Sequence, residues 1–167
     1  MIVIDVEASG LDPQSYPIEI AWQDSENEAN FDSFLIVPHP SWVHWDMYAE
    51  QKIHGITRRL LADEGILPQD ACARLNRELT GKTVYSDAVN FDQSWITTLF
   101  QVIGMTTSFE LSSIQGTLPE GGELQYKNLF EASTVKHRAL DDVRQIIGWV
   151  NKICDTDAKK SSFKGMH

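Results

Sequence analysis

The chain has 167 residues, of which 42% are hydrophobic and 23% are charged, a composition typical of one globular domain with a buried core. Its apolar runs are too short for a transmembrane helix. Its net charge of −10 excludes the basic surface by which many proteins bind nucleic acid, so a protein of this composition that handles phosphates must obtain positive charge from metal ions.

The first part of the chain has the pattern of three strands. Residues 1–6 form an apolar run rich in β-branched side chains, which is typical of a strand covered on both faces. Residues 16–24 alternate apolar and polar side chains, and residues 30–38 form a third apolar segment that ends at Pro38. The acidic turn between these two segments predicts that they pair as an antiparallel hairpin.

The rest of the chain alternates between helical and strand patterns. Further helices are predicted at residues 47–53, 54–65, 68–80, 90–104, 122–133 and 138–153, and further strands at residues 82–88 and 108–114. This order predicts an α/β fold with a mixed five-stranded sheet flanked by helices. Residues 1–156 are expected to form the domain and residues 157–167 a flexible tail. Cys72 and Cys154 are isolated cysteines, which fits a reducing, cytoplasmic setting.

Two carboxylates follow the first apolar run. Asp5 and Glu7 are two residues apart in the sequence, so in a strand they point to the same face. Two like charges at the end of a buried strand repel each other and lose hydration, so a positive group is expected between them. The alternative is that both side chains already lie in the solvated mouth of the next loop.

A third carboxylate lies on the apolar side of a predicted helix. At about 100° per residue, Asp92 falls in the middle of the stripe formed by Trp95, Leu99 and Ile103. An acid that points inward is costly unless it is paired or coordinated. The alternative is that Asp92 caps the helix or interacts with its dipole.

The helix predicted at residues 138–153 begins with two adjacent aspartates. Asp142 falls at the rim of the apolar face, whereas Asp141 falls on the opposite face. Asp142 is therefore the acid that can reach inward. His137 is expected in the loop or first turn before the helix, where it can approach a substrate held near Asp142.

These motifs, in this order, resemble those of the DEDDh superfamily of 3′→5′ exonucleases. The resemblance rests on Asp5-x-Glu7 followed by "SGLDP", on Asp92 between a strand and a helix, and on His137-x-Ala-x-x-Asp142. The superfamily includes polymerase proofreading exonucleases, RNase T and oligoribonuclease. The segments "YPIEIAW" and "KIHGIT" are similar to other parts of these enzymes. The resemblance implies a ribonuclease H-like fold.

The chain departs from the superfamily pattern at two motifs. Ala8 stands directly after the first motif, where a hydroxyl residue is usual, and Ser9 follows it. Ala88 stands four residues before Asp92, where an asparagine is often found, and Asn90 lies two residues before it. These departures concern contacts to the substrate rather than the acids.

The resemblance implies a metal-dependent hydrolysis of phosphodiesters. Asp5, Glu7, Asp92 and Asp142 would bind two Mg²⁺ ions, and Mn²⁺ accepts the same oxygen ligands. His137 would act as the general base on the attacking water. The expected reaction cuts the 3′-terminal phosphodiester of single-stranded DNA or RNA and releases a nucleoside 5′-monophosphate.

The resemblance also implies contacts to the terminal nucleotide. Ser9, Gly10 and Leu11 follow the first motif, and Leu11 is a candidate to pack against the terminal base. Phe91 is a second candidate, with a place in the core as its ordinary alternative. His54 is expected near the same nucleotide or in a structural role.

Two further sets of side chains could contact nucleic acid, and each has an ordinary alternative. Trp42, Trp45 and Tyr48 could stack on single-stranded bases or pack as a loop on their own domain. Lys136 and Arg138 flank His137 and could hold phosphates or remain solvated.

Two other functions fit parts of the pattern. One is a catalytically idle adaptor of the same fold, bound to a polymerase or to another nucleic-acid enzyme. The other is an unrelated α/β protein with a structural cation site. The expected partners of the enzyme are single-stranded 3′ ends of nucleic acids, and no membrane is expected. The sequence does not identify protein partners.

Overall fold

The computed structural model describes residues 1–134 and 137–164, with side chains up to residue 159. Five strands form one sheet in the order β3-β2-β1-β4-β5. The strands are β1 (Ile2–Ala8), β2 (Pro17–Asp24), β3 (Asn27–Leu35), β4 (Thr83–Ser86) and β5 (Glu110–Ser113). The first three pair antiparallel, whereas β1–β4 and β4–β5 are parallel. The predicted mixed five-stranded sheet is therefore confirmed.

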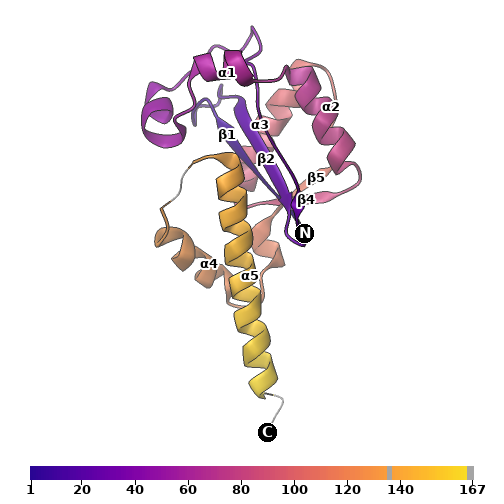
Figure 1. Cartoon of the computed structure of the whole chain (residues 1–167), viewed down its shortest axis with the longest axis vertical. Coiled ribbons are helices and arrows are strands. Elements are labelled where there is room, and N and C mark those ends of the chain that lie inside the picture. The colour runs from indigo at the N-terminus through magenta and orange to yellow at the C-terminus, as the bar shows by residue number, and fades with distance from the viewer. Residues whose placement is uncertain (135–136, 165–167) are drawn as a thin grey trace.

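Helices surround this sheet in the predicted α/β order. They are η1 (Ala49–His54), α1 (Arg58–Glu64), α2 (Pro68–Leu79), α3 (Val89–Val102), η2 (Ile114–Thr117), α4 (Gly122–Glu131) and α5 (Ala139–Lys164). Figure 1 shows α5 beside the sheet at its start and projecting beyond the body of the domain at its end. The helix continues past residue 153, where its end was predicted, because neither proline nor glycine interrupts residues 149–164. Among the described helices, none is long and apolar enough to cross a membrane.

The two faces of the sheet are covered by different helices. Ile4 on β1 packs in a core with Leu75 of α2 and Leu99 of α3. Its neighbour Val3 packs in a second core with Val143 of α5. Because side chains alternate along a strand, this arrangement places Asp5 on the same face as Val3, toward α5. The strand is buried on both faces, as its continuous apolar run predicted.

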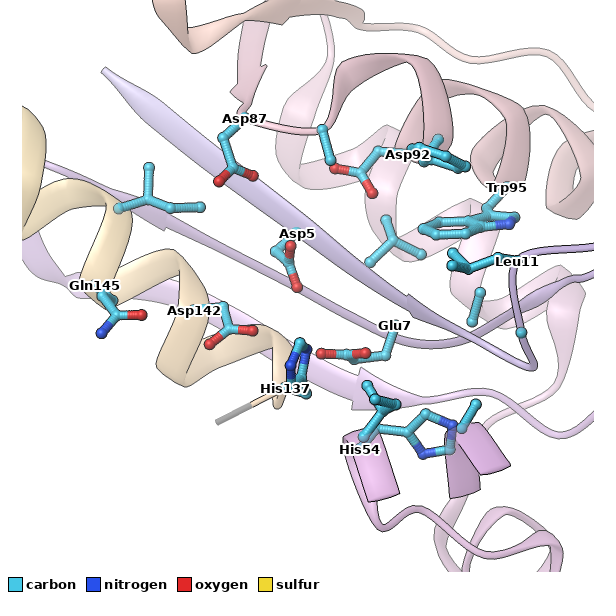
Figure 2. A pocket seen from close by; sticks show the side chains of 18 of the residues that line it. Asp5, Glu7, Leu11, His54, Asp87, Asp92, Trp95, His137, Asp142 and Gln145 are labelled. Carbon is cyan, nitrogen blue, oxygen red and sulfur yellow. The ribbon is translucent and has the colours of Figure 1, made fainter. Parts of the chain in front are cut away.

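The parallel pairing of β1 and β4 brings their carboxyl ends to one edge of the sheet. Val3 is paired with Tyr85, so continuing the register by two residues brings Asp5 beside Asp87. The first turns of α3 and α5 lie at the same edge, as Figure 2 shows. Open α/β sheets bind their ligands at the carboxyl ends of strands, so this edge is where a site is expected.

Candidate active site

A cavity of about 420 Å³ opens at the carboxyl ends of β1 and β4. The five residues predicted for catalysis all line it: Asp5, Glu7, Asp92, His137 and Asp142. They come from β1, from the first turn of α3, from the first turn of α5 and from the residues just before α5. Segments that are far apart in the sequence thus converge on one small volume (Figure 2).

Three of these side chains lie close enough to share one cation. One ligand atom from each of Glu7, His137 and Asp142 lies within 4.8 Å of the other two. His137 has a φ of 50°, which is the left-handed conformation that is uncommon for residues other than glycine. In the view of Figure 2, Asp5 lies between this group and the more distant Asp92.

The carboxyl groups of the cavity are held in an environment that opposes their ionisation. Burial, followed by the charges of Asp92 and Glu7, raises the pKa of Asp5 well above its usual range. Burial and the nearby Asp142 raise the pKa of Glu7 from 4.5 to about 8. Burial also raises the pKa of Asp92 to about 7, although a hydrogen bond from Ser86 lowers it. Such shifts occur where buried like charges lack a compensating cation.

The inward orientation predicted for Asp92 is confirmed, because its exposed fraction is 1%. The Ser86 hydroxyl donates a hydrogen bond to Asp92 Oδ2, while Ala88 occupies the cap position of α3. The capping alternative for Asp92 is therefore wrong. Asp142 is buried and lines the cavity, whereas Asp141 is exposed on the other side of the helix, as the helical pattern predicted.

The residues expected near a terminal nucleotide differ in their exposure and in whether they line the cavity. Gly10, Leu11, His54 and Phe91 line the cavity. Leu11 is 75% exposed and Phe91 51% exposed, so the core alternative for Phe91 is wrong. Ser9 is fully buried, and its hydroxyl accepts a hydrogen bond from the Tyr16 amide at 3.2 Å.

The loop conformation at Gly10 depends on glycine. Its φ of 155° is rarely adopted by other residues, and an added Cβ would lie 2.9 Å from Asp46 Cβ. The backbone thereby follows the rim of the cavity closely, and Leu11 continues from it into an exposed position.

His54 has a fixed tautomer in the cavity wall. Its Nδ1 accepts a hydrogen bond from the Ile56 amide at 2.9 Å, so Nε2 carries the proton in the neutral ring. Burial lowers the pKa of His54, which favours that neutral form. Among the described residues, Nε2 has no hydrogen-bond partner.

Two of the three aromatic side chains in this loop pack within the domain. Trp42 stacks on Tyr16 with ring centroids 5.0 Å apart, and Trp45 Nε1 donates a hydrogen bond to Glu50 at 2.7 Å. These two tryptophans pack on their own domain. Tyr48 is 67% exposed and lines the cavity.

Arg138 is not simply solvated, because its guanidinium is bound to Glu19. Lys136, the other flanking cation, lies outside the described residues. Glu19 was not predicted as part of the site. It is 3% exposed and is paired with Glu7 across the β1–β2 ladder.

Asp87 is a further carboxylate of the cavity that the motifs did not identify. It follows β4 directly, lines the cavity and accepts a hydrogen bond from the Tyr126 hydroxyl at 3.0 Å. Burial raises the pKa of Asp87. The parallel register of β4 with β1 places it beside Asp5, and no local sequence pattern gives that register.

The donor set of the cavity fits hard divalent cations. Carboxylate oxygens are the ligands that Mg²⁺ and Mn²⁺ prefer, and Asp5, Glu7, Asp92 and Asp142 supply them from three elements. Burial is the largest cause of the raised pKa values of Glu7 and Asp92, and a bound cation would favour their ionised forms. The residues present therefore fit the predicted metal ions.

The fold is shared with solved structures of exonuclease I. The Escherichia coli enzyme in complex with a dT13 oligonucleotide superposes with a TM-score of 0.72 at 15% identity, over 97% of this chain and 42% of that chain. The zinc-bound form of its complex with single-stranded DNA gives 0.68 at 17% identity, over 90% and 40%. Exonuclease I from Methylocaldum szegediense gives 0.65 at 18% identity, over 88% and 38%.

The chain spans about two fifths of the length of those enzymes. No protein-family model matches its sequence, and no curated protein matches it. The likeness is therefore one of structure at low identity. The ribonuclease H-like fold that the resemblance implied is confirmed: this chain has the architecture of the matching part of exonuclease I.

Proposed function

We propose that this protein is a metal-dependent 3′→5′ exonuclease that hydrolyses the terminal phosphodiester of single-stranded DNA or RNA and releases nucleoside 5′-monophosphates. One observation carries the proposal. Four acids and a histidine, which the sequence motifs single out, line one cavity within a fold shared with exonuclease I.

The carboxylates would hold the metal ions. Asp5, Glu7, Asp92 and Asp142 would bind two Mg²⁺ ions, for which Mn²⁺ would substitute. When bound, the ions would supply positive charge to the scissile phosphate and lower the pKa of water. The Ser86 hydroxyl restrains Asp92 through its hydrogen bond, so that this carboxylate is held in one orientation.

His137 would remove the proton from the attacking water. Its ring lies near Glu7 and Asp142, within the 4.8 Å group described above, and this proximity supports the role. Imidazole is suited to proton transfer near neutral pH. The left-handed backbone at His137 is consistent with a residue held for function, because such conformations concentrate at active sites.

The apolar mouth of the cavity would hold the terminal base. Leu11 and Phe91 are exposed there, and Phe91 packs on Trp95 with ring centroids 5.6 Å apart. Bases stack on such surfaces in a sequence-tolerant way. An unpaired base can enter the mouth, whereas a paired one must first leave its duplex, so single-stranded ends are the expected substrate.

The experiment is a time course with 5′-labelled single-stranded DNA and RNA of matched sequence, with Mg²⁺ and with chelator. We expect a ladder of products shortened from the 3′ end, mononucleotides as the released product, and no reaction in chelator. Asp142→Asn and Asp141→Asn are a matched pair, because they change adjacent aspartates on opposite faces of α5. Binding of the oligonucleotide without shortening would instead favour the idle adaptor.

A further inference from the structure

We propose that the ion pair between Glu19 and Arg138 is the positioning device of this site. It holds the backbone that carries His137 and the start of α5 in the geometry that the reaction needs. The inference rests on the proposed exonuclease function and concerns two residues to which the predicted mechanism gives no role.

Glu19 receives four hydrogen bonds from the segment that begins α5. Arg138 Nη2 donates to Glu19 Oε1 at 2.7 Å, and Arg138 Nε donates to Oε2 at 3.0 Å and to Oε1 at 3.2 Å. The Ala139 amide donates to Oε2 at 3.0 Å. The Glu19 side chain is 4% exposed. A planar guanidinium fork on a buried carboxylate fixes direction as well as distance, so the start of α5 is attached rigidly to β2.

This attachment lies next to the catalytic group. Glu19 is opposite Glu7 in the β1–β2 ladder, and Glu7 belongs to the 4.8 Å group with His137 and Asp142. His137 directly precedes Arg138, and Asp142 lies one turn further along α5. The contact therefore fixes both residues that approach Glu7 from this segment.

The ion pair also affects the charge balance beside Glu7. Glu7 and Glu19 are like charges opposite each other in a sheet, which is unfavourable by itself. Arg138 compensates the charge of Glu19 directly through the fork. Without Arg138, the segment would be repelled from the strand against which it must pack.

The backbone of His137 also needs an external restraint. Its φ of 50° is unfavourable for a residue with a side chain and persists only where the surroundings determine it. On its carboxyl side, the structure shows the fork of Arg138 and the bonded amide of Ala139. The Arg138 carbonyl also accepts the helical hydrogen bond of the Asp142 amide at 3.0 Å. Loss of the fork would allow His137 to relax away from its place beside Glu7.

The alternative is that the ion pair stabilises the fold and nothing more. The chain provides a matched control, because Asp32 and Arg74 form a second fork between a strand and a helix. Its residues come from β3 and α2, its carboxylate is similarly shielded at 11% exposure, and neither residue lines the catalytic cavity.

The experiment compares Glu19→Gln and Arg138→Gln with Asp32→Asn and Arg74→Gln in the full chain. Melting temperature, kcat and KM are measured on an oligonucleotide with Mg²⁺. We expect kcat to fall roughly 10- to 100-fold in the first pair, because misplacement by about 1 Å costs as much as 10²-fold, with KM changed only a few-fold. The control pair should lose comparable thermal stability and keep kcat within about twofold of the wild type.

Arg138→Lys separates geometry from charge and serves where the other variants do not fold. It keeps the positive charge beside Glu19 and loses the fork, so its kcat should remain well below the wild-type value while its melting temperature recovers. Wild-type kcat in a folded Arg138→Lys or Glu19→Gln protein would overturn the inference and leave the proposed function intact. An inactive wild type would overturn both.

Discussion

Glu7 should destabilise the metal-free protein as the pH rises. In the folded protein its pKa is raised from 4.5 to about 8, whereas in the unfolded chain it titrates near its ordinary value. The folded state therefore keeps a proton on Glu7 that the unfolded state has already released. The favourable contribution is complete below about pH 4.5 and is lost as the pH rises through about 8.

The rise in the pKa of Glu7 determines how much stability the folded protein loses. A rise of about 3.5 pKa units corresponds to about 5 kcal/mol at 1.36 kcal/mol per unit, as an upper limit. For a domain of this length, about 1 kcal/mol moves the melting temperature by about 2–4 °C. Glu7→Gln removes the titrating charge, so at pH 9 in chelator it should melt about 10 °C above the wild type, and at pH 4 the two should melt together.

The assay is thermal unfolding at pH 4, 7 and 9, with chelator and with Mg²⁺. Mg²⁺ should stabilise the wild type more than Glu7→Gln, because the variant lacks one of the proposed ligands. Glu28→Gln is the control, since Glu28 is exposed on β3. If wild type and Glu7→Gln melted at the same temperature at every pH in chelator, burial and the neighbouring carboxylates would not raise the pKa of Glu7.

Three further predictions concern the reaction. Asp92→Asn and Asp142→Asn should each lose at least about tenfold in initial rate, and Asp141→Asn should stay near the wild type; a dead Asp141 variant beside a live Asp142 variant would contradict the helix assignment. Activity should vanish in chelator and return with Mg²⁺ or Mn²⁺ but not with Ca²⁺, whose looser coordination misplaces the reacting groups; full activity in chelator would exclude the metal site. His137→Ala should lose roughly 10²- to 10⁴-fold in rate with Mn²⁺ binding retained by calorimetry, and a stable, fully active variant would rule out its role as base.

The parts of the site that follow from local periodicity could be predicted from the sequence. The alternation of side chains in β1 places Asp5 and Glu7 on one face whatever the strand pairs with. The angular step of about 100° per residue in α5 likewise places Asp142 and Asp141 on different faces of the helix. These patterns need no knowledge of the neighbouring elements, and the structure agrees with both.

The parts that depend on pairing between distant segments could not be predicted. Asp87 reaches the cavity because β4 is parallel to β1 in a particular register, and no local pattern states that register. Glu19 meets Arg138 across 119 positions of the sequence. Read alone, the glutamate looks like the polar face of a half-buried strand, and the arginine like a solvated charge at a helix start.

The charge of the cavity explains why Arg138 is bound to Glu19 rather than left for a phosphate. Six carboxylates line the cavity: Asp5, Glu7, Asp46, Asp87, Asp92 and Asp142. Two divalent ions would bring four positive charges, fewer than these side chains carry when all are ionised. If Arg138 turned to a substrate phosphate, Glu19 would be left buried beside Glu7 as a further, uncompensated charge. A buried ion pair that loses one partner is strongly destabilised. In the proposed mechanism the metal ions would therefore meet the substrate phosphate, and Arg138 would stay bound to Glu19.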